Sequence, residues 1–301
     1  MTKLVLLVSM VFYSLSFACT SDGEEGIVPD NDLYISADMK SLNGMEEDMF
    51  NDVITQVETI FAPIVSSFGG KLKVVRKWTD GTVNAYAKRS GKTYEVHMFG
   101  GLARHETITP DALALVVCHE IGHHIGGAPK KGARWASNEG QADYWSSLKC
   151  LRKAWLNDNN KEIMSKVQVP ATVVKMCQKQ YSQEADQFIC QRSAMAGKST
   201  GDLFAALRRQ SKKPSFDTPD KNVVSKTNDN HPAPQCRLDT YFQGALCAMD
   251  ENTDVDQKDE KVGTCMAEQG SQNIGVRPTC WHKAGGRTIG RKPRTWWIAD
   301  L

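Results

Sequence analysis

Two histidines four residues apart, with a glutamate between them, form a motif whose residue types and spacing predict metal chemistry. His119, Glu120 and His123 lie in the run HEIGH, inside the apolar segment 108–127. Residues four apart share one helix face, with Cβ atoms roughly 5–6 Å apart, so both imidazoles can reach one zinc ion. Glu120 lies about 100° round the helix, where it can take a proton from a zinc-activated water. The motif therefore predicts a zinc site with Glu120 as general base.

The segment around the motif has the sequence signals of a buried helix. Thr109 is a good N-cap, Pro110 suits the first helical position, and the glycines at 126–127 end the apolar run. H-E-x-x-H also arises by chance, and the alternative is a buried helix whose polar residues are satisfied locally. Burying two imidazoles and a carboxylate without partners costs several kcal/mol, which favours a bound ion.

A catalytic zinc needs a third protein ligand, and the best candidate lies shortly downstream. Glu139 and Asp143 are four residues apart in the run SNEGQADYW, so they share one face of a second predicted helix. We expect Glu139 to bind the zinc and Asp143 to accept a hydrogen bond from a ligand imidazole, as a second-shell partner. The alternative is a solvated helix start whose acidic residues are favoured by the helix dipole.

The elements before and after the motif predict an α+β fold. Residues 44–66 show helical periodicity, and 196–213 carry a further helix. Three strand-like runs with glycine-containing turns between them predict a small antiparallel meander: residues 72–78, 82–89 and 92–100. We therefore expect a small antiparallel sheet packed on a mainly helical domain.

The N-terminus has the composition of an export signal. Lys3 precedes an apolar run over residues 4–18, which is short for a membrane span and typical of a signal peptide, here 1–18. Cys19 follows a small residue, so we expect lipidation at Cys19 and a polar tether over 19–32. The alternative is ordinary cleavage near Ala18, with Cys19 incidental. Either interpretation predicts an exported protein, and the first places it on a membrane of the bacterial envelope through a lipid anchor.

The cysteine count agrees with export. Eight cysteines remain besides Cys19: Cys118, Cys150, Cys177, Cys190, Cys236, Cys247, Cys265 and Cys280. An even number in an exported chain predicts a disulfide set, whose pairing the sequence leaves open. No C-x-x-C occurs, so a cysteine-ligated zinc is disfavoured. The alternative for Cys118 is a buried free thiol, because this residue lies inside the apolar predicted helix.

Overall composition bounds the class of protein. The chain has 301 residues, 41% of them apolar and 24% charged, with a formal net charge of +2. This is ordinary for a globular protein of one full-sized domain, or of one domain plus a smaller appendage, and it gives no indication of nucleic-acid binding.

Three motifs in order along the chain resemble a known family. The HExxH helix followed by ExxxD is similar to the gluzincin metallopeptidases. The run VNAYA at 83–87 with GGL at 100–102, and the run HPAPQCRL at 231–238, more narrowly resemble the HtpX/BepA/Oma family, to which the CaaX prenyl protease also belongs. The resemblance spans roughly residues 80–245.

The resemblance implies a zincin-like zinc metallopeptidase domain over 33–245, with a cysteine-rich, basic extension over 246–301. It implies a zinc-dependent metalloendopeptidase that hydrolyses peptide bonds of cell-envelope proteins. The alternative is a non-catalytic, exported zinc-binding chaperone or scaffold with the same fold. The intact Glu120 favours the enzyme, because a scaffold has no chemical need for it. The substrate and the oligomeric state stay open.

The resemblance also implies roles for residues outside the helix motif. A strand over 92–99 is expected to pair with an extended peptide. His231 is expected to stabilise the oxyanion, and Arg237 to pair with an acidic residue near the zinc; structural roles are the alternative for both. The segment 182–186 lies where the family usually keeps ExxxD, but Ser182 stands at the ligand position, so Glu184 is the rival to Glu139 as third ligand.

Overall fold

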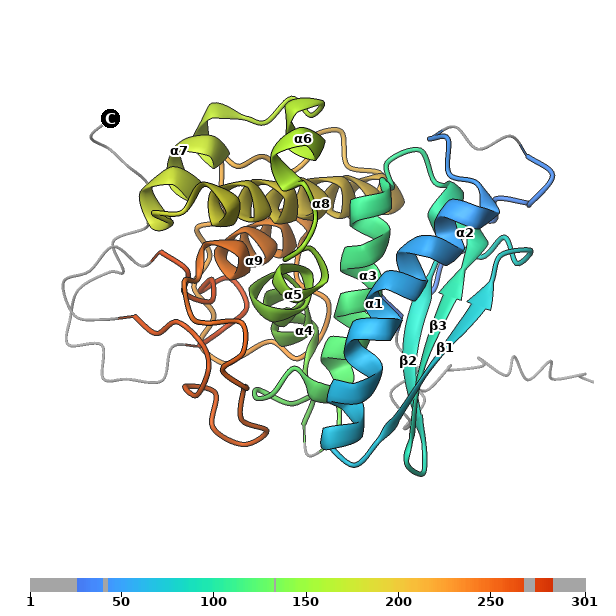
Figure 1. Ribbon diagram of the computed structural model, residues 1–301, viewed down its shortest axis with the longest axis horizontal. Helices are drawn as coiled ribbons and strands as arrows, with labels where there is room; N and C mark the ends of the chain where they lie inside the picture. The colour runs from blue at the N-terminus through green and yellow to red at the C-terminus, as the bar shows by residue number, and fades with distance from the viewer. Residues whose placement is uncertain (1–25, 40–42, 133, 268–273, 284–301) are drawn as a thin grey trace, which may run out of the picture.

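The computed structural model describes residues 26–39, 43–132, 134–267 and 274–283, and one buried helix organises them (Figure 1). Helix α3 (Pro110–Ile125) lies between a sheet with one long helix on one side and a group of helices on the other. The Thr109 side chain caps it by accepting a hydrogen bond from the Ala112 N–H at 3.1 Å. Every residue from Ala112 to Ile125 is buried, so the predicted helix is confirmed and forms the centre of the core.

The first side of α3 is covered by helix α1 and a three-stranded sheet. Helix α1 (Glu47–Ser67) buries one apolar stripe at helical spacing: Phe50, Ile54, Val57, Phe61 and Val65. This stripe packs α1 against α3 and against strand β1. The strands are β1 (Lys71–Lys77), β2 (Ala85–Ser90) and β3 (Thr93–Phe99), and the short helix α2 (Gly100–Arg104) follows them.

The α+β class is confirmed, but the predicted antiparallel meander is wrong in strand order. The order is β1-β3-β2, with β3 parallel to β1 and antiparallel to β2. Only β2 and β3 form a hairpin, through a tight turn at Gly91 with φ +59°. The segment 78–84 does not form a hairpin between β1 and β2. Strand β2 instead lies two positions away from β1, and β3 then takes the position between them. Since β3 is central and paired on both sides, the prediction that strand 92–99 pairs with an extended peptide is wrong.

Helices cover the second side of α3. They are α4 (Glu139–Trp145), the π-helical turn η1 (Ser146–Cys150), α5 (Leu151–Ala154), α6 (Asn160–Ser165), α7 (Ala171–Gln180), α8 (Glu184–Leu207) and α9 (Pro234–Leu246). Helices α4 and α8 contact α3, and α9 contacts both of them (Figure 1). The helix predicted at 196–213 is thus the second half of α8, which begins twelve residues earlier at Glu184.

Four disulfides join the eight cysteines, which confirms the predicted disulfide set. The pairs are Cys118–Cys150, Cys177–Cys190, Cys236–Cys280 and Cys247–Cys265. Cys118 is therefore no free thiol. The last described residues pack onto α4, where the Tyr144 hydroxyl donates to the Gly275 carbonyl at 2.6 Å.

The two ends of the chain are described only in part. The predicted signal peptide, Cys19, the tether up to residue 25 and the basic tail after residue 283 lie outside the described residues. Within the predicted tether over 19–32, residues 26–28 are buried against the fold, whereas residues 29–32 are exposed as a polar tether would be. Among the helices of the described ranges, none has the length and apolar character to cross a membrane.

Candidate metal centre

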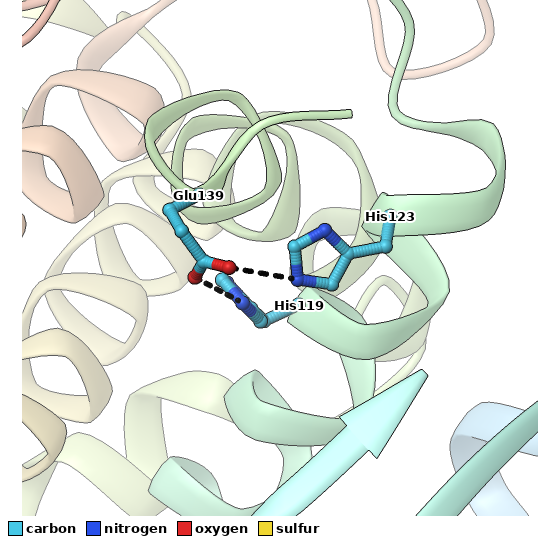
Figure 2. Close-up of side chains that lie close together, drawn as sticks. All are labelled: His119, His123 and Glu139. Atoms are coloured by element: carbon cyan, nitrogen blue, oxygen red, sulfur yellow. Dashed lines mark ion pairs between the residues drawn. The ribbon is translucent and has the colours of Figure 1, made fainter. Parts of the chain in front are cut away.

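Three predicted side chains from two helices converge on one point (Figure 2). Nε2 of His119 lies 3.4 Å from Oε2 of Glu139, and Nε2 of His123 lies 3.6 Å from Oε1 of Glu139. The ligand atoms of the three residues all lie within 4.8 Å of one another. Two nitrogen donors and one oxygen donor arranged in this way match the protein ligands of a catalytic zinc.

Local sequence brings the two helices together at this point. Asn138 caps the start of α4, accepting a hydrogen bond from the Gln141 N–H at 2.9 Å, so Glu139 stands in the first helical turn. Gly122, inside the HEIGH motif, faces α4 closely; a Cβ there would lie 3.1 Å from Trp145 and 3.3 Å from Ala142. The absence of a side chain at Gly122 therefore allows α3 and α4 to approach.

The buried donor atoms fit a metal cation. His119 Nε2, His123 Nε2 and Glu139 Oε2 are buried, and within the described ranges none has a hydrogen-bond partner. Unpaired polar atoms in a core are costly, and three pointing at one another is a rare arrangement. A cation that accepts all three lone pairs removes this cost. The residues present therefore fit a bound metal ion.

The electrostatics of the site also favour a cation. Burial lowers the pKa of His123 to about 4, which keeps its imidazole neutral, as a ligand must be. Burial alone would raise the pKa of Glu139, but the electrostatic interaction with the adjacent His231 and His123 side chains lowers it well below its usual range. Glu139 is therefore a carboxylate and His123 a neutral imidazole near neutral pH. Although burial acts in the opposite direction, Asp143 raises the pKa of His119 to about 9, so a metal would displace a proton from His119.

A buried network behind His119 orients that imidazole. Nδ1 of His119 lies 2.7 Å from Oδ1 of Asp143. Asp143 also accepts hydrogen bonds from Arg237 through Nε and Nη2, both at 2.7 Å, and from the Tyr241 hydroxyl at 2.6 Å. Burial alone would raise the pKa of Asp143, but the nearby Arg237 and His119 lower it. With Nδ1 directed at a carboxylate, Nε2 of His119 is left for the metal.

A separate contact orients His123. Its Nδ1 donates to the Ser137 carbonyl at 2.8 Å, which again leaves Nε2 facing Glu139. Sequence reasoning missed Ser137 and Tyr241. Tyr241 follows Arg237 by four residues on α9, and this spacing was the available signal. Ser137 acts through its backbone, for which the sequence carries no signal.

Glu120 lies in the same core with an unusual protonation equilibrium. Both of its carboxyl oxygens are buried and lack a hydrogen-bond partner within the described residues. Burial raises the pKa of Glu120 to about 8, although the charge of His119 acts in the opposite direction. A carboxylate with a raised pKa is a better proton acceptor, which is the property a general base needs.

The structure places the remaining candidates as follows. Nε2 of His231 lies 3.3 Å from Oε2 of Glu139, so it stands at the edge of the metal centre. Arg237 pairs with Asp143 and lies 3.9 Å from Glu139, as expected for a partner of an acidic residue near the metal. Glu184 begins α8 and pairs with Lys161 at the surface, so the rival ligand is away from the buried histidines.

A helix carrying HExxH, joined at a buried point by a glutamate from a following helix, defines a metallopeptidase centre. The model of Peptidase family M48 matches residues 50–240, and the chain belongs to this family. The match covers β1 to β3, both helices of the metal centre, His231 and Arg237. No curated protein and no solved structure matches the chain.

Proposed function

We propose that this metallopeptidase is a zinc-dependent endopeptidase in which Glu120 is the general base. The observation that carries the proposal is the convergence of His119, His123 and Glu139 on one buried point. Their two nitrogens and one oxygen suit zinc, and a three-residue set leaves a coordination position open for catalysis. Glu120, adjacent to His119 in the chain and without a partner among the described residues, is available for proton transfer.

Each residue of the site has its own role in the proposed hydrolysis. When bound, zinc supplies Lewis-acid chemistry, which polarises a carbonyl and lowers the pKa of water. Glu120 takes the proton from the attacking water and delivers it to the leaving amine. His231 donates from Nε2 to the carbonyl oxygen that becomes negative in the transition state. Asp143 holds His119 and Arg237 in place throughout.

We propose the outer edge of β2 as the surface that binds the peptide backbone. Strand β3 pairs with the other edge of β2, and Gly26 and Ile27 of the chain itself pair antiparallel with the start of the outer edge, at Tyr86 and Ala85, so this edge already binds a peptide backbone. A cavity of about 100 Å³ lies beside Arg237, between residues 28–31 and the end of α8, with an apolar wall that includes Phe204, Leu207 and Pro232. Such a wall favours an apolar side chain on the bound peptide.

The N-terminal sequence supports a cellular location for the substrates, the cell envelope. The apolar run at 4–18 and Cys19 support export and lipid anchoring, and they motivate cell-envelope proteins as substrates. In the Glu120→Gln background, which keeps the residues upstream of Ile27, we expect a radiolabelled fatty acid to enter the chain with Cys19 and not a Cys19→Ser variant. Equal labelling of the two chains, or none of either, would contradict the anchor.

A Glu120→Gln variant tests the enzymatic proposal. The amide cannot accept the proton, so we expect casein hydrolysis to fall by about 10²–10⁴ while zinc content stays at that of the wild type. Glu106→Gln, at an exposed position before the same helix, is the matched control and should hydrolyse casein normally. A zinc-loaded wild type that hydrolyses no protein or peptide would favour the scaffold instead.

A further inference from the structure

The chain's own N-terminal segment, residues 26–35, lies beside residues 81–86, which lead into β2 and include the first two residues of its outer edge. It runs antiparallel to β2 and to the residues just before it. The Ile27 N–H donates to the Ala85 carbonyl at 2.8 Å, and the Ile35 N–H donates to the Gly81 carbonyl at 2.7 Å. The edge proposed for peptide substrates therefore already carries a peptide, bound through backbone hydrogen bonds that any sequence can make.

Two successive carbonyls of this segment are held by residues of the metal centre. The Gly26 carbonyl accepts a hydrogen bond from Nε2 of His231 at 2.8 Å, and the Ile27 carbonyl accepts one from Nη1 of Arg237 at 2.5 Å. The same Nε2 of His231 lies 3.3 Å from Oε2 of Glu139. The Gly26 carbonyl is thus next to the metal ligands and in contact with the group proposed to stabilise an oxyanion.

The side chains on either side of this carbonyl fit the site closely. Ile27 is fully buried, and Val28 is 2% exposed. The Asn84 amide binds both backbone groups of Val28, accepting from its N–H at 3.4 Å and donating to its carbonyl at 3.2 Å. A Cβ at Gly26 would overlap the Asn84 side chain and the Ala85 carbonyl. The segment is therefore held in one register. Only glycine fits at position 26, whose carbonyl lies beside the metal centre.

We propose that Gly26–Ile27 is a cleavage site that the chain hydrolyses in itself. This inference rests on the proposed peptidase activity. One water adds across the amide: the C–N bond breaks, Gly26 gains the hydroxyl as a carboxylic acid, and Ile27 gains the proton as an amine. The acid then passes its proton to the amine, which leaves a carboxylate and an ammonium group. Glu120 transfers the proton, and His231 stabilises the oxygen of Gly26. Cleavage separates Cys19 from the residues that begin at Ile27.

The N-terminal residue of the purified full chain tests the proposal directly. We expect the wild type to begin at Ile27 by Edman sequencing and intact-mass spectrometry. The Glu120→Gln variant should keep residues upstream of Ile27. The Gly26→Val variant should lose cleavage at this bond, because its side chain has no room, while it binds as much zinc as the wild type. Asp32→Val, at an exposed position of the same segment, should be cleaved normally.

Casein hydrolysis by the same preparations separates this inference from the peptidase proposal. A wild type that hydrolyses casein but is uncut at Gly26–Ile27 overturns the self-cleavage and leaves the proposed function standing. A Glu120→Gln chain that begins at Ile27 also overturns it, because another protease must then make the cut. If the zinc-loaded wild type hydrolyses neither casein nor itself, the proposed function fails and the inference fails with it.

Amide hydrogen exchange gives a readout that does not depend on activity. In the uncut Glu120→Gln chain, the amides of Ile27 and Val28 should exchange at least tenfold more slowly than in the Glu120→Gln/Gly26→Val double variant. Equal exchange in the two chains would show that the segment does not occupy the edge of β2, and would overturn the inference.

Discussion

Nδ1 of His119 lies 2.7 Å from the same carboxylate, that of Asp143, that accepts two hydrogen bonds from Arg237. One buried acidic residue thus orients a candidate metal ligand and the guanidinium that holds a backbone carbonyl of the bound segment. The metal centre and the peptide-binding edge therefore share one support, and a change at Asp143 must affect both.

We expect Asp143→Asn to weaken zinc binding by about 10–100-fold, because the amide no longer fixes the His119 tautomer. The variant should also lose roughly 3–5 kcal/mol of stability, since it leaves the Arg237 charge buried without its partner. Competition with a chromophoric chelator and urea unfolding measure the two effects. Glu162→Gln, which removes an exposed ion pair with Lys166, is the control and should change neither. Wild-type zinc affinity in Asp143→Asn would contradict the network.

Substitution of the two rival glutamates decides the third ligand. Glu139→Gln should reduce the zinc retained after gel filtration to a small fraction of one ion per chain, because a carboxamide is a poor zinc ligand. Glu184→Gln should retain zinc fully, since Glu184 pairs with Lys161 at the surface. Inductively coupled plasma mass spectrometry gives both values. Loss of zinc in Glu184→Gln alone would assign the ligand to α8.

Removal of the metal should destabilise the fold. The unpaired donors of His119, His123 and Glu139 lose their common partner when the ion leaves. A ligand present at a hundred times its Kd stabilises a protein by about 2.7 kcal/mol, so excess chelator should lower the Tm by several degrees. Calorimetry with and without EDTA measures the shift. Glu139→Gln should show no response to EDTA, and an unshifted wild type would exclude a bound stabilising ion.

Asp239 should make stability depend on pH away from the metal centre. Burial raises the pKa of Asp239 to about 7, although it accepts hydrogen bonds from the Asp220 N–H and from Gln235. The folded state then holds a proton that the unfolded chain releases near pH 4. The free energy of unfolding that this proton contributes is therefore present at low pH and is lost as pH rises to 7. Relative to Asp239→Asn, the wild type should be less stable at pH 8 than at pH 5 by about 2 kcal/mol. Urea unfolding at the two pH values checks the sign, and a pH-independent difference would refute it.

The metal helix could be predicted from sequence because its signals are local. Thr109, Pro110 and the spacing of His119 and His123 all lie within one element, and the structure keeps each in its predicted place. Glu139 and Asp143 were predicted for the same reason, since both stand on one face of one short helix. In each case the spacing along the chain determines the geometry.

The strand order and the peptide edge could not be predicted, because they depend on contacts between distant segments. Three strand-like runs are compatible with several pairings, and only packing against α3 and α1 distinguishes β1-β3-β2 from a meander. The contact of His231 with Gly26 joins residues 205 positions apart. A polar composition at 19–32 suggested a tether, and two buried apolar residues at 27–28 were too few to outweigh it.

The bond between Cys118 and Cys150 encloses the three candidate metal ligands, Glu120 and Asp143 in one covalent ring. His119, Glu120, His123, Glu139 and Asp143 all fall between its two ends. The ring excludes the most extended arrangements of this stretch before folding, which reduces the entropy lost when the ligands gather. Thiol oxidation and zinc capture are thereby coupled. A chain kept under reducing conditions should therefore hold its ion more weakly, although every ligand is intact.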